Sequence, residues 1–151
     1  ALGHEREDPH LAAAPRTRPD VDRVHQPHRS GDFYQGRQGF TYADGLTGSS
    51  AGSSAISMTI FALPPSARAK THLHRGIETA VYAIEGEVGM HFDQRLGEPL
   101  VARAGECVYV PADTPHLVLN RSNAICRALV AHTSSDDQAG IVLLPELDAL
   151  V

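Results

Sequence analysis

Two stretches of the sequence decide the fold: PPSARAKTHLHRGIETAVYAIEG at residues 64–86 and GECVYVPADTPHLVLN at residues 105–120. In the first stretch His72 and His74 are two positions apart, and residues with this spacing on a β-strand leave the same face. Glu78 has the same parity, so after the intervening Arg-Gly bend we expect its carboxylate to return to that face. The first stretch therefore predicts two imidazoles and one carboxylate on one side of a sheet.

The second stretch adds a third histidine. His116 opens the apolar run 116–119 and follows the turn Pro-Ala-Asp-Thr-Pro at 111–115. If this run forms a strand beside the first stretch, three imidazoles and one carboxylate come together. Imidazole nitrogen suits divalent zinc, copper, iron and nickel, and a carboxylate extends the range to manganese. The candidate metal ligands are His72, His74, Glu78 and His116.

Short apolar runs continue on both sides of these stretches. Each run is bounded by Gly, Pro, Asn, Asp or Ser at intervals of roughly 8–12 residues, which is typical of an all-β sandwich or barrel. The expected strands are 55–63, 79–84, 87–92, 107–110, 116–119, 125–131 and 141–144. Glu85-Gly86 is a hairpin signal between two of these strands. No long helical periodicity is present, and residues 145–148 are expected to open a short final turn.

The first thirty residues have a different composition. They contain four prolines, five arginines and five acidic residues, but few large apolar side chains. We therefore expect 1–30 to be an arm that is disordered or lies along a neighbour, and 31–151 to form the barrel domain. Four of the nine histidines lie in this arm, at spacings that match no compact metal site: His4, His10, His25 and His28.

The overall composition excludes several classes of protein. A chain of 151 residues supports one ordinary domain, and no apolar run approaches the ~20 residues of a membrane span. The net charge of −5 provides no basic excess for nucleic acid. Cys107 and Cys126 form neither a metal spacing nor a disulfide framework, so we expect buried thiols in a reducing cytoplasm. The start of the sequence lacks a secretory-signal pattern, which also favours the cytoplasm.

The two stretches resemble the paired motifs of the cupin superfamily. The second motif fits at four positions, Gly105, Pro111, His116 and Asn120. Asp113 stands where the motif usually has a glycine. Asp tolerates a left-handed backbone better than most residues, so we expect the turn to survive.

The first motif fits at His72, His74 and Glu78, with Ser66 in place of the usual leading glycine. Seven residues, and not the usual six, separate Glu78 from Gly86, which leaves the hairpin register uncertain. The resemblance implies a single cupin jelly-roll β-barrel with an N-terminal extension. It also implies one divalent ion per chain, which could be Fe, Mn, Zn, Ni or Cu.

The sequence is further similar to a group of small bacterial cupins labelled mannose-6-phosphate isomerase-like, a label that reflects fold and not activity. A divalent ion, three neutral histidines and one carboxylate leave a site charge of +1, which favours an anionic ligand. We expect a metal-dependent protein that acts on a small oxygenated, anionic molecule. Isomerase, lyase or cyclase chemistry is slightly preferred over dioxygenase chemistry. The alternative is a non-catalytic, metal-loaded module that binds a small molecule. We also expect a homodimer.

Strand alternation predicts the remaining interior. The expected inward residues are Ala80, Tyr82, Ile84, Val88, Met90, Phe92, Val118 and Asn120. Tyr82 and Asn120 are candidate catalytic residues, since a buried hydroxyl or amide needs a partner, although a purely structural role fits equally. His91 is expected to face outward. The orientation of Arg127 and His132 stays open, and an inward Arg127 would suit a carboxylate.

Overall fold

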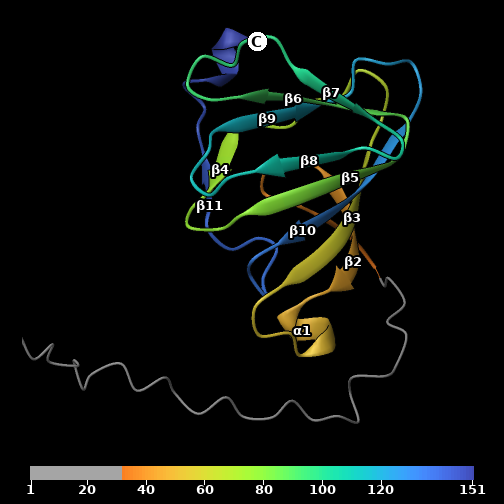
Figure 1. The fold of residues 1–151 in the computed structure, drawn as a ribbon, viewed down its shortest axis with the longest axis vertical. Helices are drawn as coiled ribbons and strands as arrows, with labels where there is room; N and C mark the ends of the chain where they lie inside the picture. The colour runs from red at the N-terminus through yellow and green to blue at the C-terminus, as the bar shows by residue number, and fades with distance from the viewer. Residues whose placement is uncertain (1–31) are drawn as a thin grey trace, which may run out of the picture.

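The computed structural model describes residues 32–151, which form two antiparallel sheets that face each other (Figure 1). The first sheet has the strand order β1 (Phe33–Gln35), β2 (Thr41–Leu46), β3 (Ser57–Leu63), β10 (Cys126–His132), β5 (Thr79–Glu85) and β8 (Cys107–Val110). The second has the order β11 (Ile141–Leu143), β4 (His72–His74), β9 (His116–Leu119), β6 (Glu87–Phe92) and β7 (Leu100–Arg103). The expected all-β architecture is confirmed. The arm expected at 1–30 lies outside the described residues.

The helical content of residues 32–151 is small. One turn of helix, α1 (Gly48–Ala51), follows β2, and a short 3-10 helix (Asp148–Leu150) lies near the C-terminal end. No helix in this part of the chain is long and apolar enough to cross a membrane.

The strands form because apolar and polar residues alternate along them. In β10 every second residue is buried, in the order Cys126, Ala128, Val130 and His132. The inward row therefore changes from apolar to imidazole at the end of the strand. Neighbouring β5 shows the matching change, since His132 pairs with Thr79 and Val130 pairs with Val81. This polar end of the apolar interior positions the candidate site.

The orientation predicted for β5 is wrong by one residue. Thr79, Val81 and Ala83 face the interior, whereas the expected inward residues Ala80, Tyr82 and Ile84 face outward. A shift of one residue turns every side chain of a strand to the opposite face. The shift arises in the turn before β5, where Gly76 takes a left-handed conformation (φ 65°). Beyond the hairpin, Val88 and Met90 are buried as predicted, and Phe92 is half-buried against the core.

Strand β9 is buried on both faces. On one side Val118 joins the main core, and on the other Leu117 and Leu119 pack with Leu96 and Leu147. A strand that is packed on both sides has little freedom to shift, because a close-packed interior resists displacement. His116 therefore begins a rigidly supported strand.

Two further expectations concern single residues. Asp113 takes the left-handed conformation (φ 61°) at the position where a glycine is usual, and so does Ser66 (φ 60°). The two cysteines are free, but only Cys126 is buried and Cys107 is exposed. The expectation of two buried thiols is therefore wrong for Cys107, which lies on the outward face of β8.

Candidate metal centre

Three histidines meet inside the barrel. His72 and His74 lie on β4, and His116 on β9 is paired directly opposite His72. The three side chains are only 2%, 4% and 3% exposed. One potential ligand atom from each residue lies within 4.8 Å of those of the other two. Strand parity therefore predicted this part of the cluster correctly.

Two of the three rings are held by backbone carbonyls. The Nδ1 atom of His72 lies 2.8 Å from the carbonyl oxygen of Lys70, and Nδ1 of His116 lies 2.9 Å from that of Thr114. A carbonyl oxygen only accepts hydrogen bonds, so in both neutral rings Nδ1 carries the proton and donates. The lone pair is then on Nε2. This is the tautomer and the outer contact that metal-binding histidines commonly have.

The third ring, His74, has a buried Nδ1 with no hydrogen-bond partner within 3.5 Å among the described residues. Burial lowers the pKa of His74 to about 3, and the nearby His132 and His116 rings add to the effect, although the nearby backbone of Ala139 opposes the fall. Burial likewise lowers the pKa values of His72 and His116. All three imidazoles are therefore neutral at pH 7, which is the state that binds a metal ion.

The loops that flank the histidines are joined to each other. The amide of Asp113 donates to the carbonyl oxygen of His74 at 3.0 Å, and the amide of Gly76 donates to Oδ1 of Asp113 at 3.1 Å. The turn before His116 thus supports the turn after His74. This explains how residues about forty positions apart keep a fixed geometry.

The structure does not bring Glu78 to this cluster. Its side chain is exposed, and its Oε1 accepts a hydrogen bond from the hydroxyl of Tyr109 at 2.6 Å on the outside of the first sheet. Thr79 takes the inward position instead. The expectation that the Glu78 carboxylate returns to the histidine face is therefore wrong, for the one-residue reason given for β5. A divalent ion held by three neutral imidazoles alone would leave a site charge of +2 and not +1.

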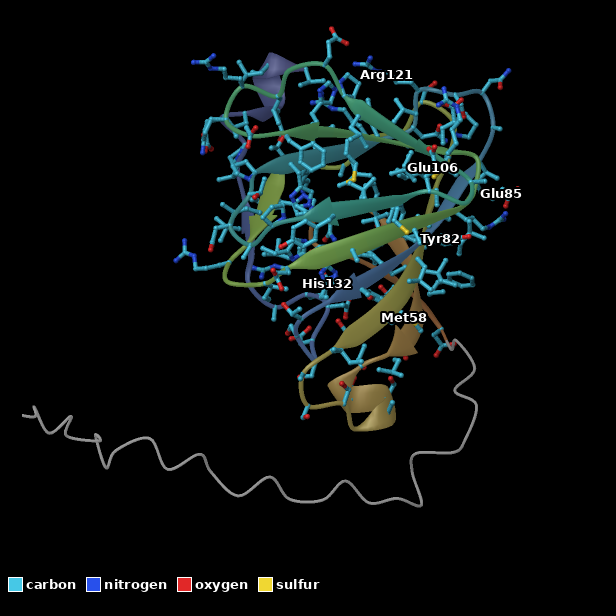
Figure 2. All side chains as sticks on the ribbon, viewed as in Figure 1. Met58, Tyr82, Glu85, Glu106, Arg121 and His132 are labelled. Atoms are coloured by element: carbon cyan, nitrogen blue, oxygen red, sulfur yellow. The ribbon has the colours of Figure 1, made fainter. Side chains whose placement is uncertain are left out.

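A fourth histidine, His132, lies beside the cluster at the end of β10 (Figure 2). It is buried, and its ring centroid is 4.6 Å from that of His74. Its Nδ1 lies 2.9 Å from Oγ1 of Thr79. The sequence left the orientation of His132 open. An outward Arg127 on the same strand would, however, have indicated an inward His132. Residues five positions apart on a strand face opposite ways, and Arg127 faces outward, where it forms an ion pair with Glu85.

The other two candidate residues lie elsewhere. Tyr82 is 43% exposed on the outer face of the first sheet (Figure 2). Asn120 is buried, but its Nδ2 donates to the carbonyl oxygens of Leu63, Pro64 and Ala124. Its Oδ1 accepts from the amide and hydroxyl of Ser122. These contacts engage both polar atoms of the amide group, so in the described residues Asn120 joins loops.

His91 is outside the site, as predicted, but it is buried and not solvated. Its Nδ1 contacts the carbonyl oxygen of Gly97, and a guanidinium nitrogen of Arg121 lies 3.4 Å from its Nε2. The loop that follows β6 therefore covers it. His91 is therefore a buried histidine outside the cluster.

A small cavity adjoins the four histidines. Its free volume is about 20 Å³, which is enough for about one water molecule. Its polar lining consists of Gln38, His72, His74, Thr79, His116 and His132. The remaining lining residues are Phe40, Tyr42, Phe61, Val81, Met90, Val118 and Val130. Two of these lining residues, Gln38 and His74, each have a buried polar atom without a hydrogen-bond partner within 3.5 Å among the described residues.

Two packed antiparallel sheets enclose the buried histidine triad, as the paired sequence motifs imply for a cupin. Residues 59–132 match the family model of the cupin domain. The chain is a small member of the cupin superfamily. A search of curated proteins found no match.

Solved structures share the fold. An uncharacterized conserved protein with a double-stranded beta-helix domain from Klebsiella pneumoniae is 16% identical, with 82% of this chain and 92% of that chain covered and a TM-score of 0.56. A cupin-superfamily sugar phosphate isomerase from Silicibacter pomeroyi is 26% identical, with 78% and 75% covered and a TM-score of 0.53. An oxalate oxidase in complex with the substrate analogue glycolate is 19% identical, with 87% and 69% covered and a TM-score of 0.65.

The donor set fits a divalent metal ion. Three neutral nitrogen ligands suit the later first-row ions iron, nickel, copper and zinc better than manganese, which prefers oxygen. The two carbonyl contacts that fix His72 and His116 are the outer support that such ligands need. The residues that could hold the ion are therefore His72, His74 and His116.

Proposed function

We propose that this protein is a metal-dependent cupin that acts on a small oxygenated, anionic molecule, with one divalent ion per chain held by His72, His74 and His116. The observation that carries the proposal is the buried triad of neutral imidazoles, whose ligand atoms lie within 4.8 Å of one another. Three protein ligands are typical of catalytic metal sites, in which a position is left for water or substrate.

The charge of the site supports an anionic ligand. An ion with three neutral ligands keeps its full +2 charge, and the apolar wall of Phe40, Phe61 and Met90 lowers the local dielectric. An oxygen anion is therefore attracted more strongly here than at the surface. When bound, the ion would supply Lewis-acid polarisation of a carbonyl or carboxylate. The residues of the chain orient the ligand and exclude water from it.

We prefer isomerase, lyase or cyclase chemistry over dioxygenase chemistry, and the 26% identity to a protein described as a sugar phosphate isomerase supports this preference. Membership of the mannose-6-phosphate isomerase-like group belongs to the same proposal. The cavity of about 20 Å³ favours a ligand of few atoms unless the barrel opens. We also place the protein in the cytoplasm, in keeping with its free cysteines.

The alternative is a metal-loaded binding module without turnover. The small cavity and the cover of aromatic and methionine side chains favour it. A further ionisable group beside the triad favours an enzyme, and His132 is such a group. Turnover of any compound that binds only to the metal-loaded protein would decide between the two.

The experiment that tests the proposal is a metal titration followed by a ligand titration. Untagged protein should bind close to one ion per chain, and His74→Ala should abolish this binding while His91→Ala retains it. The metal-loaded protein is then titrated with small carboxylates, keto acids and sugar phosphates, with metal-free protein as the control. Equal metal loss in both variants, or ligand binding that ignores the metal, contradicts the proposal.

We also propose that the chain forms a homodimer through the outer face of the first sheet. Met58, Tyr82 and Tyr109 on this face are 42%, 43% and 59% exposed. They come from β3, β5 and β8, and Figure 2 labels Met58 and Tyr82. An exposed apolar patch of this kind marks an interaction surface, and symmetric dimers are the commonest assemblies.

Sedimentation tests the dimer. The full chain should be a dimer at micromolar concentration, and Tyr82→Glu should make it a monomer. Val101→Glu is the matched control, since Val101 is an exposed apolar residue on the other sheet. A monomeric full chain, or equal effects of the two substitutions, contradicts the proposal.

A further inference from the structure

His132 differs from the three triad histidines in the partner of its ring. His72 and His116 each turn Nδ1 to a backbone carbonyl, whereas His132 turns Nδ1 to the hydroxyl of Thr79 at 2.9 Å. A hydroxyl can donate as well as accept, so the proton of His132 is not forced onto Nδ1. The tautomer of this ring therefore depends on whether the Thr79 hydroxyl has another hydrogen-bond acceptor.

Thr79 is buried, and His132 is the one side-chain partner of its hydroxyl among the described residues. If Nδ1 of His132 were the donor, the hydroxyl proton of Thr79 would be buried without an acceptor, which is costly. If the hydroxyl donates to Nδ1, both groups are satisfied. The proton of the neutral His132 ring is then on Nε2, opposite to the assignment for His72 and His116.

This tautomer separates His132 from the metal ligands. Its Nδ1 lone pair is engaged by Thr79, and its Nε2 carries a hydrogen, so neither nitrogen is ready to bind a cation. The ring nevertheless lines the same cavity as the triad and lies 4.6 Å from the His74 ring, centroid to centroid. A neutral N–H donor beside a cation site suits an oxygen anion.

We propose that His132, oriented by Thr79, is the recognition residue of the site and donates a hydrogen bond from Nε2 to an oxygen atom of the anionic ligand. This inference rests on the proposed function and names the group that recognises its ligand. It also gives the inward Thr79 a role. Thr79 and His132 supply a neutral donor at this position. The Asp137 carboxylate, which acts on His132 electrostatically, is bonded to Tyr34 and Gln138.

The first test observes the tautomer directly, in the metal-free protein and without any ligand. Long-range ¹H–¹⁵N spectra of the histidine rings distinguish a protonated Nε2 from a protonated Nδ1. His132 should show a proton on Nε2, and His72 and His116 should show protons on Nδ1 as internal controls. The spectrum of His132→Phe assigns the signal. A proton on Nδ1 of His132 overturns the proposal.

The second test measures binding of formate, the smallest carboxylate, to the Co²⁺-loaded full chain. Thr79→Val keeps the His132 ring but removes its orienting hydroxyl, and His132→Phe removes the donor. We expect each variant to bind Co²⁺ within about threefold of wild type and formate about tenfold more weakly, the effect of losing one hydrogen bond to a charged group. His91→Phe is the control and should change neither.

The outcomes separate the two proposals. Wild-type protein that fails to bind Co²⁺, or binds formate equally well without it, contradicts the proposed function itself. If the wild-type protein binds Co²⁺ and binds formate only with it, but Thr79→Val and His132→Phe bind formate normally, only the role of His132 is overturned. Loss of Co²⁺ from both variants, to the extent seen in His74→Ala, would make His132 a metal ligand and also overturn the inference. If His132→Phe fails to fold, the ring signal that shifts in Thr79→Val assigns His132 instead, because Thr79 is the side chain bonded to that ring. The tautomer spectrum and the formate affinity of Thr79→Val then decide.

Discussion

Replacing Glu78 by glutamine distinguishes two ligand sets. The structure brings three histidines together, whereas the sequence pattern adds the Glu78 carboxylate. The Glu78 carboxylate is on the outside of the first sheet, bonded to Tyr109. Glu78→Gln should therefore leave metal binding unchanged. His74→Ala should remove it, because His74 supplies one of the three clustered nitrogens.

Thermal unfolding with and without metal gives the magnitude. A free ion at about one hundred times its Kd stabilises the folded state by about 2.7 kcal/mol. At roughly 4 °C per kcal/mol for a domain of this size, the Tm should rise by about 10 °C. Wild type and Glu78→Gln should show the same rise on addition of Zn²⁺, and His74→Ala should show none.

The comparison uses the difference between metal-loaded and metal-free protein for each variant, so small effects of the substitutions on the metal-free fold cancel. A rise in Glu78→Gln that is as small as in His74→Ala would refute the reasoning. It would mean that the carboxylate turns inward when the ion binds and that the register of β5 shifts with it.

Three other predictions follow from the same geometry. Burial lowers the pKa of His74 to about 3 and that of His132 to about 4, below the ~6.5 of an unfolded histidine. The unfolded chain therefore takes up protons first, so the free energy of unfolding of the metal-free protein should fall as the pH drops from about 6.5 towards 4. Urea midpoints in the presence of a chelator measure this fall, and His132→Phe should flatten it. Asn120→Ala should destabilise the fold by roughly 2–4 kcal/mol, because buried carbonyl oxygens lose their donor, while the folded fraction still binds one ion; an unchanged urea midpoint would speak against this role. Removal of residues 1–30 should leave a folded, metal-binding barrel and weaken the dimer, which circular dichroism and sedimentation check; an unfolded product contradicts the first part.

The strands and the triad were predictable because they depend on local alternation. His72 and His74 share a face on any strand, and the run 116–119 begins with His116 whatever precedes it. The short strands β1 and β2 escaped prediction because neither contains a run of large apolar residues. They are strands because they pair with each other and with β3.

The position of Glu78 was not predictable from parity, because parity does not continue through a bend. In this bend the amide of Gly76 donates a hydrogen bond to Asp113, which is distant in sequence. One local signal was present, since seven residues and not the usual six lie between Glu78 and Gly86. The usual six intervening residues, 80–85, place the motif's carboxylate position at Thr79, the residue that does face inward.

The orientations of His132 and Arg127 depend on each other. Their spacing places them on opposite faces of one strand, so an exposed Arg127 commits His132 to the interior. The sequence shows that the two residues face opposite ways, but it does not show which of them faces inward. The position of β10 between β3 and β5 decides which residue faces inward, and this position depends on the whole sheet.

The strand that carries two of the three candidate ligands has an uneven attachment. β4 pairs with β11 along its whole length, at His72, Leu73 and His74, but with β9 only through His72 and His116. Partial opening of a fold starts where few contacts hold an element and needs less energy than global unfolding. If the triad holds an ion, we expect the ion to leave when β11 and then β4 separate from the sheet, because this movement would remove His72 and His74 together. The residence time of the ion then reports on the fraying of the last strand of the barrel, and hydrogen exchange at β11 should slow when the ion is bound.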